Sequence, residues 1–245
     1  MFIAEIQGHK TYSLATIIDL KVEAEFPDID SLSYCSVTFS KQDILRTAYV
    51  MQFNRTEQSH QPQPSQQLRL YLPNPDKQIN AQLESASTLK LSTPAFFGQS
   101  LSARDDQINI VLCDEAGMGS AIFLAEHYKK KGWSQNTYLF FGAKEKFSFN
   151  PVPSKFISPF LPAHVIAAMP LMEDWGILSR LLNSQLPGCF DDNPDLLLSM
   201  LVEHICQNQE SNISIEFIGF VEFLEQVQFH TNSCRVSLTK TLLVQ

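Results

Sequence analysis

The chain has 245 residues, of which 44% are hydrophobic and 18% charged, and this composition suits a folded protein of one large or two small domains. Its formal net charge of −8 would repel a nucleic-acid backbone, so we expect no nucleic-acid partner. No apolar run approaches the roughly 20 residues that cross a bilayer, and the first residues lack the pattern of a signal peptide. We therefore expect a cytoplasmic protein with no membrane partner.

The cysteines and histidines give no sign of a metal site. The five cysteines are odd in number, widely spaced and without a C-x-x-C pair, which argues against a disulfide framework, a zinc ribbon or an iron–sulfur cluster. The six histidines are equally scattered, and no H-E-x-x-H pair occurs. We expect no metal ion, and most of the cysteines are expected to be buried free thiols.

The first part of the chain, up to residue 103, is rich in short β-prone segments separated by polar loops. Such a pattern is typical of a small antiparallel barrel or sandwich. The polar segment from Arg55 to Gln66 is expected to be either the tip of a hairpin or a solvated linker. Strands are predicted at Ser13–Ala24, Tyr34–Phe39, Ala48–Asn54, Gln67–Leu72 and Thr88–Leu91.

The second part, residues 104–245, alternates apolar runs with helical periodicity. This alternation predicts an α/β domain with a mostly parallel, doubly wound sheet. Strands are predicted at Ile108–Cys113, Thr137–Phe141, His164–Met169 and Ile213–Ile218, with a terminal strand at Arg235–Val244. Helices are predicted at Ser120–Lys131, Trp175–Asn183, Pro194–Gln207 and Val221–Phe229.

Glycines mark the turn between the first apolar run of this domain and the helix that follows. Gly117 and Gly119 lack a Cβ atom, so a ligand could approach the backbone there, and the N–H groups of a helix N-terminus favour an anion such as a diphosphate. A tight structural turn would have the same glycines. The sequence thus predicts either a nucleotide-binding loop or a close-packed turn.

Four separate turns of the predicted sheet would meet at the carboxyl ends of its strands, where ligands bind in this architecture. These turns are Ala116–Ser120, Gly142–Lys144, Met169–Asp174 and Gly219–Glu222. The acidic pairs Glu173–Asp174 and Asp191–Asp192 lie near this edge, where they would recognise a ribose or substrate, or simply cap a helix and form a turn.

Three segments of the second domain match short motifs in part. Ala116–Ile122 resembles G-G-x-G-x-x-P, Phe141–Lys144 resembles Y-G-A-R, and Ile218–Phe223 resembles C-G-P-x-x-M. By these segments the chain resembles the ferredoxin-NADP reductase superfamily, including flavin reductases and the electron-transfer subunit of dihydroorotate dehydrogenase. The resemblance implies a dinucleotide ligand, NAD(P). Its implied contacts are Gly117, Met118, Gly119, Ser120, Gly142, Ala143, Lys144, Gly219 and Phe220.

The same resemblance makes the first domain a flavin-binding-like barrel. Arg46–Met51 is similar to the family pattern R-R-P-Y-S-I, and this similarity implies flavin contacts from Arg46 and Tyr49. Thr47 and Val50 stand where the family has an arginine and a hydroxyl residue. Losing both contacts would cost on the order of 2 to 5 kcal/mol, so weak retention of FAD or FMN is expected. The cysteines that hold the family's [2Fe–2S] cluster have no counterpart.

Two functions follow from these observations. The first is a flavin- and nicotinamide-dependent oxidoreductase, or an electron-transfer component with a protein redox partner. The second is a redox-inactive binding or regulatory protein on the same scaffold. The chain has neither a G-x-S-x-G elbow nor a P-loop. No catalytic residue is predicted, because hydride transfer is the chemistry of the cofactor.

Overall fold

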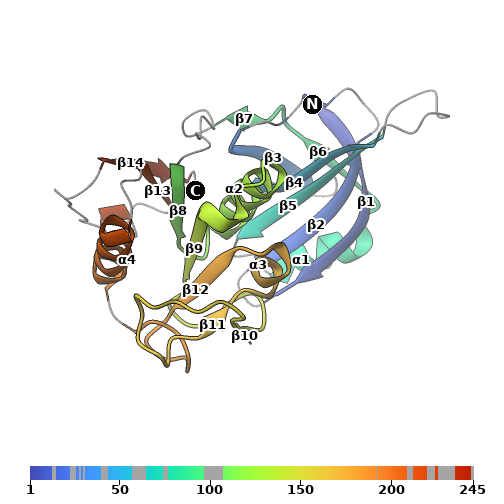
Figure 1. Ribbon diagram of the computed structural model, residues 1–245. Coiled ribbons are helices and arrows are strands. Elements are labelled where there is room, and N and C mark those ends of the chain that lie inside the picture. Colours follow the sequence, from blue (N-terminus) through green and yellow to red (C-terminus); the bar gives the residue numbers. More distant parts are fainter. Residues whose placement is uncertain are drawn as a thin grey trace. The chain divides into compact units, whose positions relative to one another are not determined.

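The computed structural model describes residues 1–12, 15–22, 26–27, 29, 31–39, 44–56, 65–73, 77–96, 107–191, 193–208, 212–219, 224–225 and 235–243. The chain divides into two compact units, Met1–Leu101 with Val244–Gln245, and Ser102–Leu243. The first unit runs from blue to green in Figure 1 and the second from green to red. Each unit is described on its own.

The first unit is a closed antiparallel barrel of six strands, as predicted. The strands follow the order β4-β5-β2-β1-β6-β3, and pairing of β3 with β4 closes the ring. A short strand, β7 (Ala95–Phe96), adds to β3, and helix α1 (Lys77–Ser85) connects β5 to β6. The six barrel strands are β1 (Phe2–Thr11), β2 (Ala15–Val22), β3 (Ser33–Phe39), β4 (Ile44–Thr56), β5 (Ser65–Pro73) and β6 (Thr88–Leu91).

Alternation along β2 shows why this sequence forms a barrel. Ile18, Leu20 and Val22 are buried, whereas Asp19 and Lys21 between them are partly exposed. Because successive side chains of a strand point to opposite faces, the apolar set fills the barrel and the polar set covers its outer surface. The sequence did not predict β1 or α1.

The second unit contains a five-stranded parallel sheet in the order β12-β9-β8-β13-β14, which confirms the predicted α/β class. A small antiparallel pair, β10 (Val152–Pro153) and β11 (Ala167–Ala168), lies outside this sheet. The sheet strands are β8 (Gln107–Cys113), β9 (Thr137–Gly142), β12 (Leu178–Leu182), β13 (Asn212–Gly219) and β14 (Arg235–Leu242). The helical elements are α2 (Met118–Lys130), η1 (Ser134–Asn136), α3 (Pro170–Trp175) and α4 (Pro194–Asn208).

Helices cover both faces of the sheet. A buried hydrophobic cluster of this unit joins Ile110 and Leu112 of β8 and Phe217 of β13 to Leu197 and Leu201 of α4. Helix α2 contacts β8, β9 and β13 and lies on the other side of the sheet from α4 (Figure 1). Strands covered on both faces are mostly apolar, which explains why all residues of β8 after Gln107 are buried and all of these but Asn109 are apolar.

Two predicted elements of this unit are wrong. The segment Trp175–Asn183 is not a helix, because α3 ends at Trp175, Gly176 adopts the left-handed conformation with φ 71°, and the chain continues as β12. The segment His164–Met169 is not a strand of the main sheet, and only Ala167–Ala168 pairs, with β10. Most of the predicted helix Val221–Phe229 lies outside the described residues.

A buried arginine fixes the long segment between β9 and β12. The Arg180 guanidinium, 2% exposed, donates to the carbonyl oxygens of Val165 at 3.1 Å, Ser179 at 2.6 Å and Phe156 at 2.7 Å. The buried Glu173 carboxylate accepts hydrogen bonds from the same segment, one of them from the Lys155 N–H at 2.7 Å. These charge-assisted bonds replace regular pairing there, so the segment is ordered with little secondary structure.

Cys35, Cys113 and Cys189 are buried free thiols, as expected. Cys206 takes part in a disulfide, which its spacing from the other cysteines did not predict.

None of the described helices has the length and apolar character needed to cross a membrane.

A half-buried carboxyl group lies on the α2 side of the sheet. The Glu216 carboxylate on β13 accepts a hydrogen bond from the Thr241 hydroxyl on β14. Burial raises the pKa of Glu216 to about 7, against the opposing effect of that bond. Burial also raises the pKa of Tyr128 on α2, with a smaller contribution from the Glu216 charge. The ionised form of Glu216 is therefore disfavoured in the folded protein.

We expect Glu216→Gln to stabilise the protein at pH 8 and to change little at pH 4. A carboxyl group whose pKa is raised on folding contributes stability below its unfolded pKa, and this contribution is lost as pH rises through about 7. The gain at pH 8 should be about 2 to 3 kcal/mol, measured by urea unfolding across this pH range. Glu203→Gln, an exposed change on α4, should leave the pH profile as it is. If stability depends on pH in the same way for Glu216→Gln and the parent protein, the raised pKa of Glu216 is wrong.

Candidate functional site

The candidate site is the carboxyl edge of the parallel sheet, where β8, β9 and β13 end together. Cys113 at the end of β8 pairs with Phe141 of β9 and with Ile218 of β13. The strand order reverses between β8 and β13, since the chain continues from β8 toward β9 and β12 and later returns to β13 and β14. In open α/β sheets ligands bind in the crevice at such a reversal.

The turn after β8 is tied to β13 and to itself. The Asp114 N–H donates to the Ile218 carbonyl oxygen at 3.2 Å, and the Asp114 carboxylate accepts from the Gly117 N–H at 2.8 Å. The carboxylate therefore lies at the N-terminus of α2, where a helix favours negative charge. A diphosphate bound at the same place would meet this charge.

Gly117 is required by the packing of the turn. A Cβ atom there would lie 2.3 Å from the carbonyl oxygen of Ile218 and 3.0 Å from the Cβ of Cys113. Its φ of −74° is open to any residue, so the constraint is space and not conformation. The backbone of β13, and not a ligand, fills the space that this glycine leaves, so close packing explains Gly117.

The next residues open α2, and one of them has an unpaired polar atom. Met118, Gly119 and Ser120 are buried. The Ser120 hydroxyl is fully buried and has no hydrogen-bond partner among the described residues. Burial of an unpaired hydroxyl costs free energy. The first N–H groups of an α-helix also have no acceptor within the helix, so this end of α2 can supply several donors to one ligand.

The predicted turn after β9 comes together with the turn after β8. The Lys144 N–H donates to the Glu115 carboxylate at 2.6 Å, and the Ala143 N–H donates to the Leu182 carbonyl oxygen at 3.1 Å. Gly142 ends β9, and the Lys144 side chain is exposed. The structure thus joins the first and second predicted turns through Glu115, a residue that the sequence analysis did not select.

Asn183, at the end of β12, was also missed. Its side-chain amide donates to the carbonyl oxygens of Ala143 at 2.9 Å and Glu145 at 3.2 Å, and its oxygen accepts from the Gln185 N–H at 2.8 Å. The buried amide holds the exit of β12 against the exit of β9. The only sequence signal for this role was the position of Asn183 directly after an apolar run. Because that run was predicted to be a helix, Asn183 was not expected at the end of a strand.

The other two predicted turns have different outcomes. Gly219 ends β13 at the same edge, and its carbonyl oxygen accepts from the Leu243 N–H at 3.1 Å, while Phe220 lies outside the described residues. Met169–Asp174 precedes β12 and therefore lies at its amino end, so it does not reach the candidate edge. Its pair Glu173–Asp174 ends α3 and caps no N-terminus.

The thiol of Cys113 lies at this edge, at the end of β8. Burial, with a smaller contribution from the Asp114 charge, raises the pKa of Cys113 well above its ordinary value, so this thiol stays protonated. In the described part of the chain, His, Cys, Asp and Glu side chains do not gather in groups of three that could hold a metal ion.

The two barrel residues that the resemblance implied both lie on β4. The Arg46 side chain is exposed, and its Nη1 donates to the Leu45 carbonyl oxygen at 3.0 Å. The Tyr49 ring is 1% exposed and lies 6.4 Å from the ring of Tyr34, which is its cross-strand partner. A flavin ring could not stack on Tyr49 in this arrangement without a change in the surroundings of the tyrosine.

Solved structures of other proteins with a similar arrangement of strands and helices identify the fold. No family model and no curated protein sequence matches the chain. Among solved structures, the ferredoxin reductase of carbazole 1,9a-dioxygenase has a TM-score of 0.63 at 10% identity and matches 97% of this chain and 68% of its own. Phthalate dioxygenase reductase has a TM-score of 0.57 at 10% identity, over 97% of this chain and 67% of its own. The chain therefore has the ferredoxin reductase-like fold.

A third structure matches over its full length. The flavohem-like FAD/NAD-binding domain of nitric oxide dioxygenase from Vibrio cholerae has a TM-score of 0.58 at 10% identity, and the match covers 98% of both chains. The expectation of weak flavin retention therefore finds no support in the comparisons, because the description of this neighbour names FAD. At such identities the likeness is one of fold.

Gly117→Ala should destabilise the protein by about 1 to 3 kcal/mol, because the added methyl group would overlap the Ile218 carbonyl oxygen. The measurement is urea unfolding without any ligand. Gly8→Ala is the matched control: a Cβ there meets nothing within 4 Å, so its effect should stay within about 0.5 kcal/mol. Equal stability of the two variants would show that β13 does not pack against the turn in this way.

Proposed function

We propose that the α/β unit binds NAD(P) at the carboxyl edge of its sheet and that the protein is an oxidoreductase or electron-transfer component of the ferredoxin reductase type. The observation that carries the proposal is the buried, unpaired hydroxyl of Ser120 at the N-terminus of α2, next to the reversal in strand order. A ligand with phosphate oxygens would satisfy this hydroxyl and the first N–H groups of the helix.

The residues at this edge have separate roles in the proposal. Ser120 and the N–H groups of Gly119 and Met118 donate to the diphosphate, and the exposed Lys144 supplies a positive charge nearby. Gly142 and Gly219 end the two strands beside the ligand. The nicotinamide, when bound, supplies the hydride, and the protein holds it in position. Asp114 and Glu115 oppose the phosphate charge, so moderate affinity is expected.

The proposal extends to a flavin in the barrel unit and to a protein redox partner. Its support is the fold, together with neighbours described as an FAD/NAD-binding domain and as a reductase for electron transfer from pyridine nucleotides to [2Fe–2S]. Arg46 and Tyr49 remain the proposed flavin contacts. Because Tyr49 is buried, its contact requires that the ring become accessible.

One observation favours the alternative, a redox-inactive binding or regulatory protein. The turn that would receive a diphosphate is packed by the Ile218 carbonyl oxygen at Gly117 and capped by the Asp114 carboxylate. Both features stabilise the turn without a ligand. The alternative predicts a folded protein that is colourless when purified and does not respond to nicotinamide or flavin cofactors.

We expect NADH or NADPH to raise the melting temperature of the protein, since a ligand that binds only the folded state stabilises it. Ser120→Ala should weaken this binding about five- to tenfold, the effect of about one neutral hydrogen bond, measured by calorimetric titration. Ser199→Ala, an exposed change on α4, is the control.

The visible spectrum of the purified protein, recorded with and without added FAD and FMN, tests flavin binding separately. If NADH, NADPH, FAD and FMN all fail to bind, the oxidoreductase proposal is wrong and the redox-inactive binding or regulatory protein is the function that fits.

A further inference from the structure

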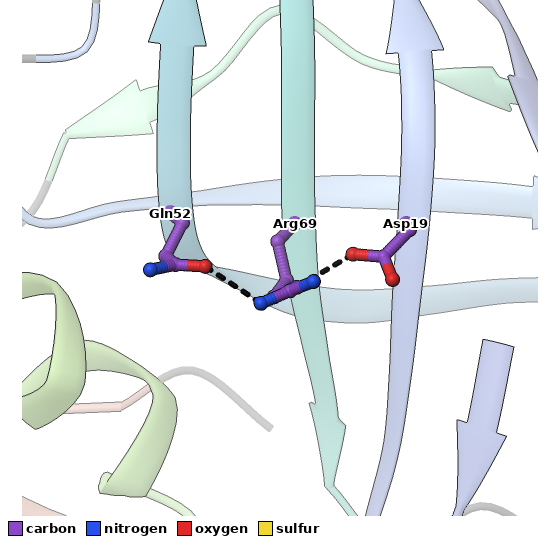
Figure 2. A network of polar contacts seen from close by, with 3 residues as sticks. All are labelled: Asp19, Gln52 and Arg69. Atoms are coloured by element: carbon purple, nitrogen blue, oxygen red, sulfur yellow. Dashed lines mark hydrogen bonds and ion pairs between the residues drawn. The ribbon is translucent and has the colours of Figure 1, made fainter. Parts of the chain in front are cut away.

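The outer surface of the barrel unit carries a row of three linked polar side chains. Asp19 of β2, Arg69 of β5 and Gln52 of β4 lie directly opposite one another on neighbouring strands. Figure 2 shows Arg69 between the other two. Its Nε donates to the Asp19 carboxylate at 2.5 Å, and its Nη1 donates to the Gln52 side-chain oxygen at 2.8 Å. Contacts on both sides hold the guanidinium in one orientation.

This row lines a cavity of about 240 Å³ in the barrel surface. Two β-bulges flank it, one in β1 between Ile6 and Gly8 and one in β4 between Val50 and Gln52. A bulge bends its strand and turns side chains toward a new direction, and this explains a hollow on an otherwise convex barrel. The polar side chains that line the cavity are Gln7, Asp19, Gln52, Asn54, Gln67 and Arg69.

Several polar atoms of the cavity are available to a ligand. The side chains of Arg69 and Asp19 are 41% and 42% exposed. The guanidinium has five N–H donors and uses two of them in the contacts above. The side-chain amides of Gln7, Asn54 and Gln67 make no hydrogen bond within the described part of the chain. The cavity thus combines one guanidinium held by two contacts with three exposed amides, and together these supply both donors and acceptors to a small polar molecule.

The charge and shape of the lining select the class of ligand. The Arg69 and Asp19 charges cancel and the other four polar side chains are neutral, so the cavity favours neither a simple anion nor a simple cation. The lining contains Leu20 and Leu68 but no aromatic ring on which a flat base would stack. The volume lies below the range of about 300–1,000 Å³ that is usual for larger ligands, and it suits a single ring.

We propose that this cavity is a binding site for a neutral sugar ring, either a free monosaccharide or the ribose of a nucleoside. Carboxylate, guanidinium and carboxamide groups each end in two adjacent polar atoms, which match two neighbouring hydroxyl groups that both donate and accept. Asp19 accepts, Arg69 donates, and Gln52 and Gln67 do both. The site belongs to the barrel unit and is independent of the proposed NAD(P) site on the sheet.

The test is calorimetric titration of the full chain with D-glucose, D-ribose, adenosine and sodium sulfate. We expect saturable binding of glucose or ribose. Arg69→Met and Gln67→Leu should each weaken this binding at least tenfold, whereas the control Lys90→Met, an exposed change on β6, should leave it unchanged. Circular dichroism checks folding, and if Arg69→Met does not fold, the exposed Gln67→Leu carries the test alone.

Which of these compounds binds tells whether the ligand is a free sugar or a nucleoside. Glucose binding assigns a free sugar, and binding of both ribose and adenosine without glucose assigns a nucleoside. Binding of sulfate alone, or of adenosine without ribose, would overturn the proposal, as would the absence of binding. Sugar binding that survives Gln67→Leu and Arg69→Met but is lost in Ser120→Ala would place the ligand on the α/β unit and would also overturn it.

Discussion

The close approach of the β8–α2 turn to the last residues of β13 is the contact on which the candidate site depends. It needs a residue without a side chain at Gly117, because the Ile218 carbonyl oxygen occupies the Cβ position, and it is locked by the Asp114 N–H bond to the same oxygen. This contact sets where α2 begins and therefore where its N–H groups and Ser120 lie. Glycine at such a turn is thus a packing requirement first, whatever the edge goes on to bind.

Periodicity in the sequence was sufficient for most strands. It failed at β1, whose side chains are mostly exposed, and at β12, where polar residues are buried. Apolar runs located β8 and β9, because strands covered on both faces are mostly apolar. Alternation of the buried Ile213, Ile215 and Phe217 with polar residues located β13. In β12 a polar residue is buried on each face, Ser179 on one and Arg180 on the other, and the spacing of the leucines is also compatible with a helix. The sequence signal that a helix had already ended was Gly176, because glycine is the usual residue after a helix, where it takes a positive φ. The partners of Arg180 come from a segment up to 24 residues away, and no local pattern reports them.

The same limit applies to the candidate site. Two of its turns follow directly from the glycines and strand ends of the sequence, whereas Glu115 and Asn183 act through backbone atoms of residues 29 and 40 positions away. Hydrogen bonds of this kind depend on the strand order, which a single sequence does not specify. The unpaired Ser120 hydroxyl likewise becomes visible only when its surroundings are known.

The electrostatics of the two units set different demands on a ligand. At the sheet edge the Asp114 and Glu115 carboxylates already accept hydrogen bonds from the Gly117 and Lys144 N–H groups. A diphosphate there must therefore gain its binding free energy from other donors, above all the Ser120 hydroxyl and the N–H groups of the first turn of α2. In the barrel cavity the Asp19 and Arg69 charges cancel, so binding there depends on matching many hydrogen bonds and not on net charge. High salt should therefore affect a ligand of the sheet edge more than a ligand of the barrel.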